Sequence, residues 1–245
     1  MDYSKYRLDR REWCLCLGVS MGLAGVIAWL FYRSIYGMLC FPVVYVFYRK
    51  RYKREHLKER TMQLLTQFAD AMQAVSSALL AGYSMEHAWQ ESQKEMEQLW
   101  GRDSYIGREL AGMNTVVAMN EPLEKVLGEF AKRSGCEDIE SFAEIFTFAK
   151  RGGGDFARII HTTVLKLTDK IEVEQEIATV LAGKRLEGRI MDGMPLFILA
   201  YLNLTSGDFL AALYGNFLGV VIMTGALAGY FAALRLSEYI LDIHV

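Results

Sequence analysis

The stretch Cys14–Tyr32, CLCLGVSMGLAGVIAWLFY, contains 19 consecutive residues without a charge. As a helix rising about 1.5 Å per residue, it is long enough to cross the hydrocarbon core of a bilayer, which is about 30 Å thick. A cleaved signal peptide is the alternative interpretation, because basic residues precede the stretch. We favour a retained membrane helix, since no small-residue cleavage pattern closes the stretch and a second apolar segment follows at once.

The chain contains three further apolar segments, one directly after the first and two near the C-terminal end: Ser34–Tyr48, Gly193–Thr205 and Phe209–Leu234. Together with the first stretch they predict transmembrane hairpins over residues 14–48 and 193–235. The segment that begins at Gly193 has only 13 residues, fewer than the roughly 20 that a spanning helix needs. A re-entrant or interfacial helix is therefore an open alternative for that segment.

Basic residues concentrate beside the apolar segments. Residues 49–60 carry seven Lys or Arg, and the N-terminal tail, residues 1–13, carries four. Positive charge favours the cytoplasmic side, so the middle of the chain and both termini, including the tail at 236–245, are expected to be cytoplasmic. Beside a helix end, such a run more often binds anionic lipid than nucleic acid. Five of its residues form the expected lipid-facing basic collar: Arg49, Lys50, Arg51, Lys53 and Arg54.

The middle of the chain, residues 61–192, is acidic and has a helical pattern. It holds 14 Lys or Arg against 21 Asp or Glu, a net charge of −7, which repels nucleic acid and favours a protein partner. Its apolar residues recur at intervals of three and four, and no segment alternates with period two. We therefore expect an all-α integral membrane protein, in which two transmembrane hairpins flank a cytoplasmic six-helix bundle.

Capping residues divide this middle region into six helices. The expected bounds are Leu57 to Gly82, Ser84 to Gln98, Tyr105 to Val117, Asn120 to Gly135, Ile139 to Arg151, and Asp155 to Asp192. Asn120 is expected to open the fourth helix, with Pro122 in its first turn. Gly82 and Gly135 are expected to end helices, and Ser84 and Asp155 to cap the helices that follow.

Two helix–turn–helix segments match at an offset of 71 residues. Gly82 corresponds to Gly153 and Ser84 to Asp155, and apolar positions on both sides also correspond: Phe68 with Ile139, Val75 with Phe146, Met85 with Phe156, Ala88 with Ile159, and Trp89 with Ile160. The pattern indicates a weak internal repeat, with chance agreement of capping signals as the alternative. Because the first helix leaves the membrane and the sixth returns to it, both turns are expected at the membrane-distal end.

Residues able to do chemistry do not converge in the sequence. The pair Gly183-Lys184 lacks the earlier glycine and the Ser or Thr of a phosphate-binding loop. The glycine run at 152–154 is followed by Asp155, whose charge would repel an anion. None of the four histidines has a partner at metal-ligand spacing: His56, His87, His161 and His244. We expect no metal, no cofactor and no enzymatic activity.

Small residues recur in the first and last apolar segments. Glycines spaced by four residues place small groups on one helix face, where another backbone can approach closely. The spacing predicts tight helix packing, either within the chain or between copies, at Gly18, Gly22, Gly215, Gly219, Gly225 and Gly229.

The stretch Leu64–Gln90, LLTQFADAMQAVSSALLAGYSMEHAWQ, resembles the opening of the type II secretion F domain. That family combines a leucine-rich helix, a glutamine, a small-residue run and Leu-x-x-Gly-x-Ser before a second amphipathic helix. Gln67, Leu79, Gly82 and Ser84 match this pattern.

Later stretches are similar to the second half of the same family: Asn120–Gly135, NEPLEKVLGEFAKRSG, and Arg151–Ile160, RGGGDFARII. Pro195 falls where such proteins commonly place a proline entering the C-terminal membrane segment. The resemblance covers nearly the whole chain and follows the layout of the TadB and TadC branch, with one copy of the domain.

The resemblance implies an inner-membrane platform protein of a bacterial Tad (Flp-type) pilus or a related secretion machine, and not an enzyme. Such proteins lie above a hexameric secretion ATPase, extract pilin subunits from the membrane, and associate with themselves or a paralogue. Tyr83 is the expected direct contact, because an exposed aromatic can anchor an interface. The expected ATPase-facing residues are Gly82, Tyr83, Ser84, Gly153, Gly154, Asp155 and Phe156.

The alternative function is a membrane sensor or transport component whose cytoplasmic helices bind a small ligand. It would need a polar membrane interior, and the apolar segments offer only Asn203, Asn216 and Thr224. A membrane enzyme is a third and less favoured possibility.

Overall fold

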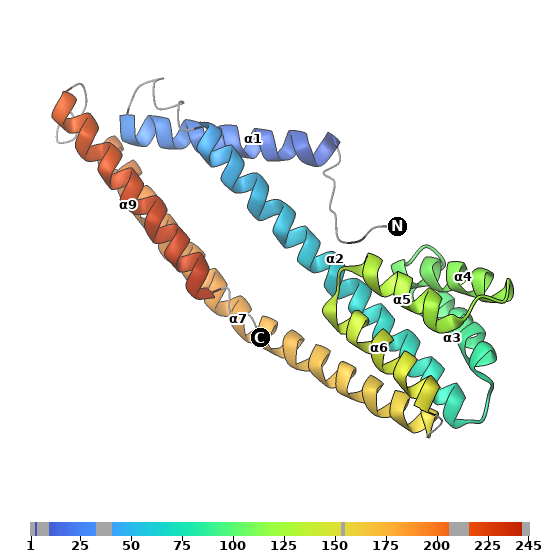
Figure 1. Cartoon of the computed structure of the whole chain (residues 1–245). Coiled ribbons are helices and arrows are strands. Elements are labelled where there is room, and N and C mark those ends of the chain that lie inside the picture. The colour runs from blue at the N-terminus through green and yellow to red at the C-terminus, as the bar shows by residue number, and fades with distance from the viewer. Residues whose placement is uncertain (1–2, 4–9, 33–40, 153–154, 206–215, 242–245) are drawn as a thin grey trace. The chain divides into compact units, whose positions relative to one another are not determined.

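The computed structural model describes residues 3, 10–32, 41–152, 155–205 and 216–241 (Figure 1). In these ranges the chain is helical and contains no strand, as the sequence predicts. The elements are α1 (Arg10–Ile27), the π-helix η1 (Ala28–Tyr32), α2 (Phe41–Leu80), α3 (Met85–Leu99), α4 (Tyr105–Ala118), α5 (Leu123–Ser134), α6 (Glu137–Gly152), α7 (Phe156–Thr205) and α9 (Phe217–Leu241).

The chain divides into two compact units. Unit 1 comprises Met1–Arg7 and Arg54–Val173, and unit 2 comprises Leu8–Lys53 and Glu174–Val245. Two of the boundaries between the units, at 53/54 and 173/174, fall inside helices, within α2 and within α7. The sequence instead places the limits of the middle domain at residues 61 and 192.

Two helices are longer than the sequence predicts. The first helix of the middle region does not begin near Leu57, because α2 is continuous from Phe41 and includes the basic run. Likewise α7 is continuous over 50 residues and ends at Thr205, past Asp192 and Pro195. A proline inside a helix removes one backbone hydrogen bond and crowds the preceding turn, but α7 continues on both sides of Pro195.

Unit 1 has one hydrophobic core to which six helices contribute. The α2 residue Phe68 is fully buried, and its ring lies 5.9 Å from that of Phe130 in α5 and 5.2 Å from that of Phe142 in α6. The core also includes residues of the other three helices: Trp89 and Met96 of α3, Ile106 and Leu110 of α4, and Ile160 and Val164 of α7. These are the apolar stripes that the helical periodicity predicts.

Most of the predicted helix ends in unit 1 are confirmed, and one is wrong. Gly135 ends α5 in the left-handed conformation, at a φ of 65°. Asn120 does not open α5; it has a φ of 67° and follows the last turn of α4, where its N–H donates to the Val117 carbonyl. Asparagine tolerates left-handed backbone, so it can close a helix as glycine does. Pro122 is consequently the residue before α5, not part of its first turn.

Unit 2 has a small core and much exposed apolar surface. Ile27, Leu30 and Phe31 pack with Val44, Met223 and Leu227. Two helical stretches, Arg10–Tyr32 and Leu218–Ser237, are long and apolar enough to cross a membrane by length and composition. The residues that join the two segments of each predicted hairpin, Arg33 and 206–208, lie outside the described residues. The exposed apolar side chains of unit 2 include Trp13, Leu15, Trp29, Phe197, Tyr201, Leu204 and Leu218.

Phe68 tests how strongly unit 1 depends on its central core contacts. We expect Phe68→Ala to lower the free energy of unfolding of the full chain in detergent by about 3–5 kcal/mol, because the cavity cannot collapse between three helices. Chemical denaturation followed by far-UV circular dichroism measures this change. The control is Met119→Ala at a side chain that is 70% exposed, expected to change the free energy by less than about 0.5 kcal/mol. Equal effects of the two variants would contradict the assignment of Phe68 to the core.

Candidate interaction surface

The turn between α2 and α3 is built by a glycine in left-handed conformation. Gly82 has a φ of 90°, its N–H donates to the Leu79 carbonyl, and the N–H of Tyr83 donates to the Ala78 carbonyl. This pair of bonds satisfies the last carbonyls of α2 as a Schellman motif does. Ser84 then caps α3, since its hydroxyl accepts from the N–H of His87 at 3.3 Å. The role of both residues as helix-end signals is confirmed.

The side chain of Tyr83 projects from this turn. It is 52% exposed, and its ring lies 5.1 Å from that of His87, tilted by 32°. Leu80, at the end of α2, is also exposed, at 53%. Both side chains lie outside the core, so a partner could bind this aromatic and this aliphatic group without disturbing the packing of unit 1.

The turn between α6 and α7 is capped in the same way. Asp155 accepts the N–H of Arg158 at 3.3 Å, and its carboxylate lies 3.6 Å from the Arg158 guanidinium. Phe156 differs from Tyr83, because it is partly buried and its ring packs 5.4 Å from that of Phe146. The remaining two residues of the predicted surface, Gly153 and Gly154, lie outside the described residues.

The structure brings the two turns to the same end of unit 1 (Figure 1). Phe146 of α6 contacts one aromatic residue of each second helix, since its ring lies 5.9 Å from that of Trp89 in α3 and 5.4 Å from that of Phe156 in α7. A hydrogen bond of 3.0 Å between Ser76 and His161 joins α2 to α7. Side chains at these turns could therefore act as one surface.

The burial pattern follows the predicted repeat at most matched positions. Phe68 and Ile139 are both buried, as are Val75 and Phe146, and Trp89 and Ile160. The exception is the pair Ala88 and Ile159, of which the first is fully buried and the second is 40% exposed. The two hairpins thus share their caps and most of their core positions.

Two polar residues of α2 position the connection between α3 and α4. The side-chain carbonyl of Gln67, which belongs to the family-like pattern, accepts the N–H of Ile106 at 3.1 Å and so caps α4. Asp70 accepts the indole N–H of Trp100 at 2.9 Å, which provides the partner that a charge beside an apolar face requires. Both residues have structural roles. The sequence alone did not indicate that Gln67 caps α4.

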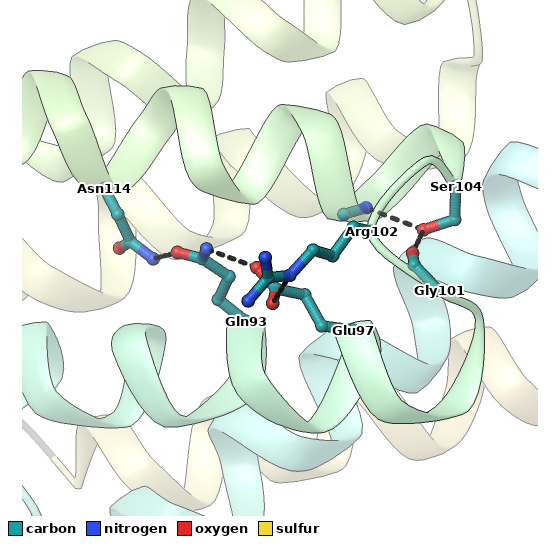
Figure 2. Close-up of polar contacts among 7 residues, drawn as sticks. Gln93, Glu97, Gly101, Arg102, Ser104 and Asn114 are labelled. Carbon is teal, nitrogen blue, oxygen red and sulfur yellow. Dashed lines mark hydrogen bonds and ion pairs between the residues drawn. The ribbon is translucent and has the colours of Figure 1, made fainter.

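A chain of polar side chains fastens α3 to α4, as Figure 2 shows. Asn114 donates to Gln93 at 2.6 Å, Gln93 donates to Glu97 at 2.8 Å, and Arg102 donates to Glu97 at 3.0 Å. The hydrogen bond from Gln93 and the Arg102 cation lower the pKa of the Glu97 carboxyl. Ser104 caps α4 by accepting the N–H of Gly107. The network fixes the hairpin and leaves no converging catalytic groups.

Sequence reasoning missed a polar cluster around Tyr3. Tyr3 is buried in unit 1, its hydroxyl donates to Glu109 at 3.0 Å, and its N–H donates to the Arg133 carbonyl at 2.9 Å. Arg133 also forms an ion pair with Glu109 at 2.7 Å, and Arg60 lies 4.9 Å from the Tyr3 ring centroid and 5.5 Å from that of Tyr105. Burial, followed by the negative charge of Glu109, raises the pKa of Tyr3 above its ordinary range.

Ser76 and His161 have the separation of a nucleophile and its base, but their surroundings do not suit catalysis. Ser76 has no exposed surface, so a substrate could not reach its hydroxyl. In the parts of the chain that the structure describes, no group of three or more His, Cys, Asp or Glu could hold a metal ion. The bond serves to join two helices.

The basic collar is exposed and surrounds its helix. Successive residues of a helix are rotated by about 100°, so the five positions point in several directions around α2. All five side chains are exposed in the structure: Arg49, Lys50, Arg51, Lys53 and Arg54.

The glycines of the apolar helices have room for a side chain. A Cβ atom added at any of four predicted packing positions, Gly18, Gly22, Gly225 and Gly229, would meet nothing within 4 Å. Gly219 is buried, and Gly215 lies outside the described residues. At these four positions the described part of the chain supplies no close neighbour, and their role in helix packing stays a prediction.

No family model, no curated protein and no solved structure matches this chain. The structure alone shows a helical protein in which two helices are long and apolar enough to span a membrane. The family resemblance seen in the sequence remains a prediction.

Gly82 tests the turn between α2 and α3. We expect Gly82→Ala to lower the free energy of unfolding by about 1 kcal/mol, because a φ of 90° is strained for a residue with a Cβ even where space is open. The matched control is Gly112→Ala in α4, also with nothing within 4 Å, where alanine should raise the free energy by about 0.5–1 kcal/mol. Chemical denaturation of the full chain in detergent distinguishes these opposite signs. Stabilisation by both substitutions would refute the left-handed turn.

Tyr3 makes the stability of unit 1 sensitive to alkaline pH. The unfolded chain loses the Tyr3 proton above about pH 10, whereas the folded chain retains it, so this contribution is complete below pH 10 and falls above it. We expect Tyr3→Phe to cost about 1–2 kcal/mol at pH 8, and the difference from the native chain to shrink as the pH rises above 10. Denaturation curves from pH 8 to 11 measure it, with the exposed Tyr83→Phe as control. A difference that stays constant up to pH 11 would contradict the buried bond to Glu109.

Proposed function

We propose that this chain is an inner-membrane platform protein of a Tad (Flp-type) pilus or related type II secretion machine. In this role it couples a hexameric cytoplasmic ATPase to pilin extraction and fibre assembly. The observation that carries the proposal is the pair of similarly capped helical hairpins whose turns meet at one end of unit 1. Their order along the chain, between apolar segments, is the order of the family that the sequence resembles.

Exposed apolar surface supports a membrane location for unit 2. Monomeric soluble proteins rarely expose large contiguous apolar patches, because each Å² of apolar surface in water costs about 25 cal/mol. Phe197, Tyr201 and Leu204 of α7 are 71%, 60% and 77% exposed, and Leu218 of α9 is 72% exposed. In a bilayer this surface faces lipid, and the basic collar on α2 meets the anionic headgroups. Multi-pass insertion in a bacterial inner membrane, with both termini and unit 1 cytoplasmic, is part of the proposal.

The proposed motor contact is centred on Tyr83. An aromatic side chain on a turn whose backbone bonds are satisfied loses little conformational entropy on binding. The acidic character of the middle region would attract a basic surface on the ATPase. Phe156 is assigned to support of the second turn, since it packs on Phe146.

The other proposed partners follow from the same role. They are pilin subunits, membrane lipids, and a paralogous platform protein or a second copy of this chain. We propose no nucleic acid partner, because the acidic middle region repels nucleic acid, and no enzymatic activity.

Photo-crosslinking at Tyr83 tests the motor contact. A photoreactive amino acid replaces Tyr83 in the full chain in native cells, and mass spectrometry identifies the captured proteins. We expect capture of a hexameric secretion ATPase, because the side chain is exposed at the turn. In parallel, Tyr83→Asp should abolish fibre assembly while the protein remains folded and in the membrane fraction.

The matched control places the same photoreactive group at Met119, which is 70% exposed in unit 1 but lies at the end of α4. Equal capture from both positions would indicate random collision. Failure of Tyr83→Asp to alter either fibre assembly or ATPase binding in a folded protein would refute the contact.

A further inference from the structure

Helix α6 has one face that the described part of its own chain leaves uncovered. Glu140, Glu144, Phe148 and Arg151 recur at intervals of three and four, so they lie on one side of the helix. The opposite side is buried in the core of unit 1. Phe148 is 79% exposed, a larger fraction than for any other exposed large apolar side chain that the structure describes.

A groove between α5 and α6 adjoins this face. It has a volume of about 390 Å³, and small side chains contribute part of its lining, at Gly128, Ala131 and Ala143. Thr147 and Phe148 lie along its α6 side. The small residues leave room for a bulky apolar side chain from another molecule.

The charged side chains that line the groove form no ion pair with the described residues of unit 1. Glu140, Glu144, Lys132 and Arg151 form no ion pair within 4.0 Å in the described chain. Charges just outside the groove are paired at 2.6 Å, Lys150 with Glu124 and Lys170 with Asp138. The groove therefore offers both signs of charge at its margin.

We propose that this surface binds a second copy of the chain, through antiparallel pairing of the two α6 helices. A two-fold axis between Thr147 and Phe148 places Arg151 of each copy opposite Glu144 of the other, so the ion pair forms twice. Phe148 of each copy then enters the groove of the other. Charge complementarity identifies the partner as a second copy of the chain. On α6, Glu144 precedes the axis and Arg151 follows it by the same number of residues, so each acid faces a base of the other copy.

The pairing surface is distinct from the proposed motor contact. It uses α5 and α6, whereas the contact with the ATPase is centred on Tyr83 after α2. The pairing rests on the proposed function in that it names the surface for the second copy proposed there. Self-association is nevertheless measured without the ATPase, so failure of the pairing and failure of the motor contact are distinguishable.

Cysteine crosslinking in native membranes tests the position of the axis. In an antiparallel pair Thr147 lies next to the axis, whereas the two copies of Ser141 are about 20 Å apart along the helices, at about 1.5 Å per residue. We expect Thr147→Cys in the full chain to form a disulfide-linked dimer on mild oxidation. Ser141→Cys, exposed on the same helix, should not, nor should the chain without an added cysteine. Crosslinking that is equal at both positions would overturn the proposed geometry.

Charge reversal tests the ion pair. Dimer dissociation constants of the full chain in detergent are measured by analytical ultracentrifugation. Glu144→Arg and Arg151→Glu should each weaken dimerisation by about tenfold or more, because each places like charges opposite one another twice. The double variant carrying both changes restores both pairs and should return to within about threefold of the native constant. A double variant as weak as the singles would overturn the proposal.

Phe148→Asp tests the apolar contact. It should abolish dimerisation without lowering the melting temperature of the monomer, since Phe148 is outside the core. Met119→Asp, a similarly exposed position in unit 1, is the control and should leave dimerisation unchanged. A chain that is monomeric at all concentrations, or whose groove binds only a different protein, would also overturn the proposal.

Discussion

Unit 1 depends on the segment of α2 between Gln67 and Ser76, because this one stretch contacts every other helix of the unit. Its polar groups bond to three helices: Gln67 to the first turn of α4, the Ala71 carbonyl to Ser92 of α3, and Ser76 to His161 of α7. Its aromatic residue Phe68 packs on α5 and α6. Polar groups on successive turns of a buried helix are tolerated only because each forms a hydrogen bond. Their bonds also fix the rotation of the surrounding helices about α2.

The sequence predicts helix ends in unit 1 well where the end is a local event. The ends at Gly82 and Gly135, and the caps at Ser84 and Asp155, depend on a few adjacent residues whose conformational preferences are strong. Asn120 shows the limit of such reasoning, because the same residue type can begin one helix or close another. The flanking turn of α4, not the identity of Asn120, decides between them.

Long-range contacts are harder to predict from the sequence, and they carry much of what is specific here. Tyr3 lies in a basic stretch of sequence, yet it is buried against Glu109, 106 positions further along the chain. The sequence around Tyr3 and the sequence around Glu109 do not indicate this hydrogen bond. The same holds for Gln67 and Ile106, and for the groove beside Phe148, which exists only once α5 and α6 are packed together. The continuity of α2 and α7 was missed for another reason: a change of composition along a helix does not end it unless a residue breaks its hydrogen bonds.

The two hairpins of unit 1 cap their second helix in the same way but differ in what they present to solvent. Each turn caps its second helix through an oxygen of Ser84 or Asp155. After the first turn the aromatic ring stays outside, with Tyr83 half exposed, whereas after the second the ring of Phe156 packs on Phe146. A side chain that fills a core position is not free to anchor a partner, so of these two aromatic residues only Tyr83 is available for the proposed contact. Substitutions at Phe156 change the packing of unit 1, whereas substitutions at Tyr83 leave that packing intact.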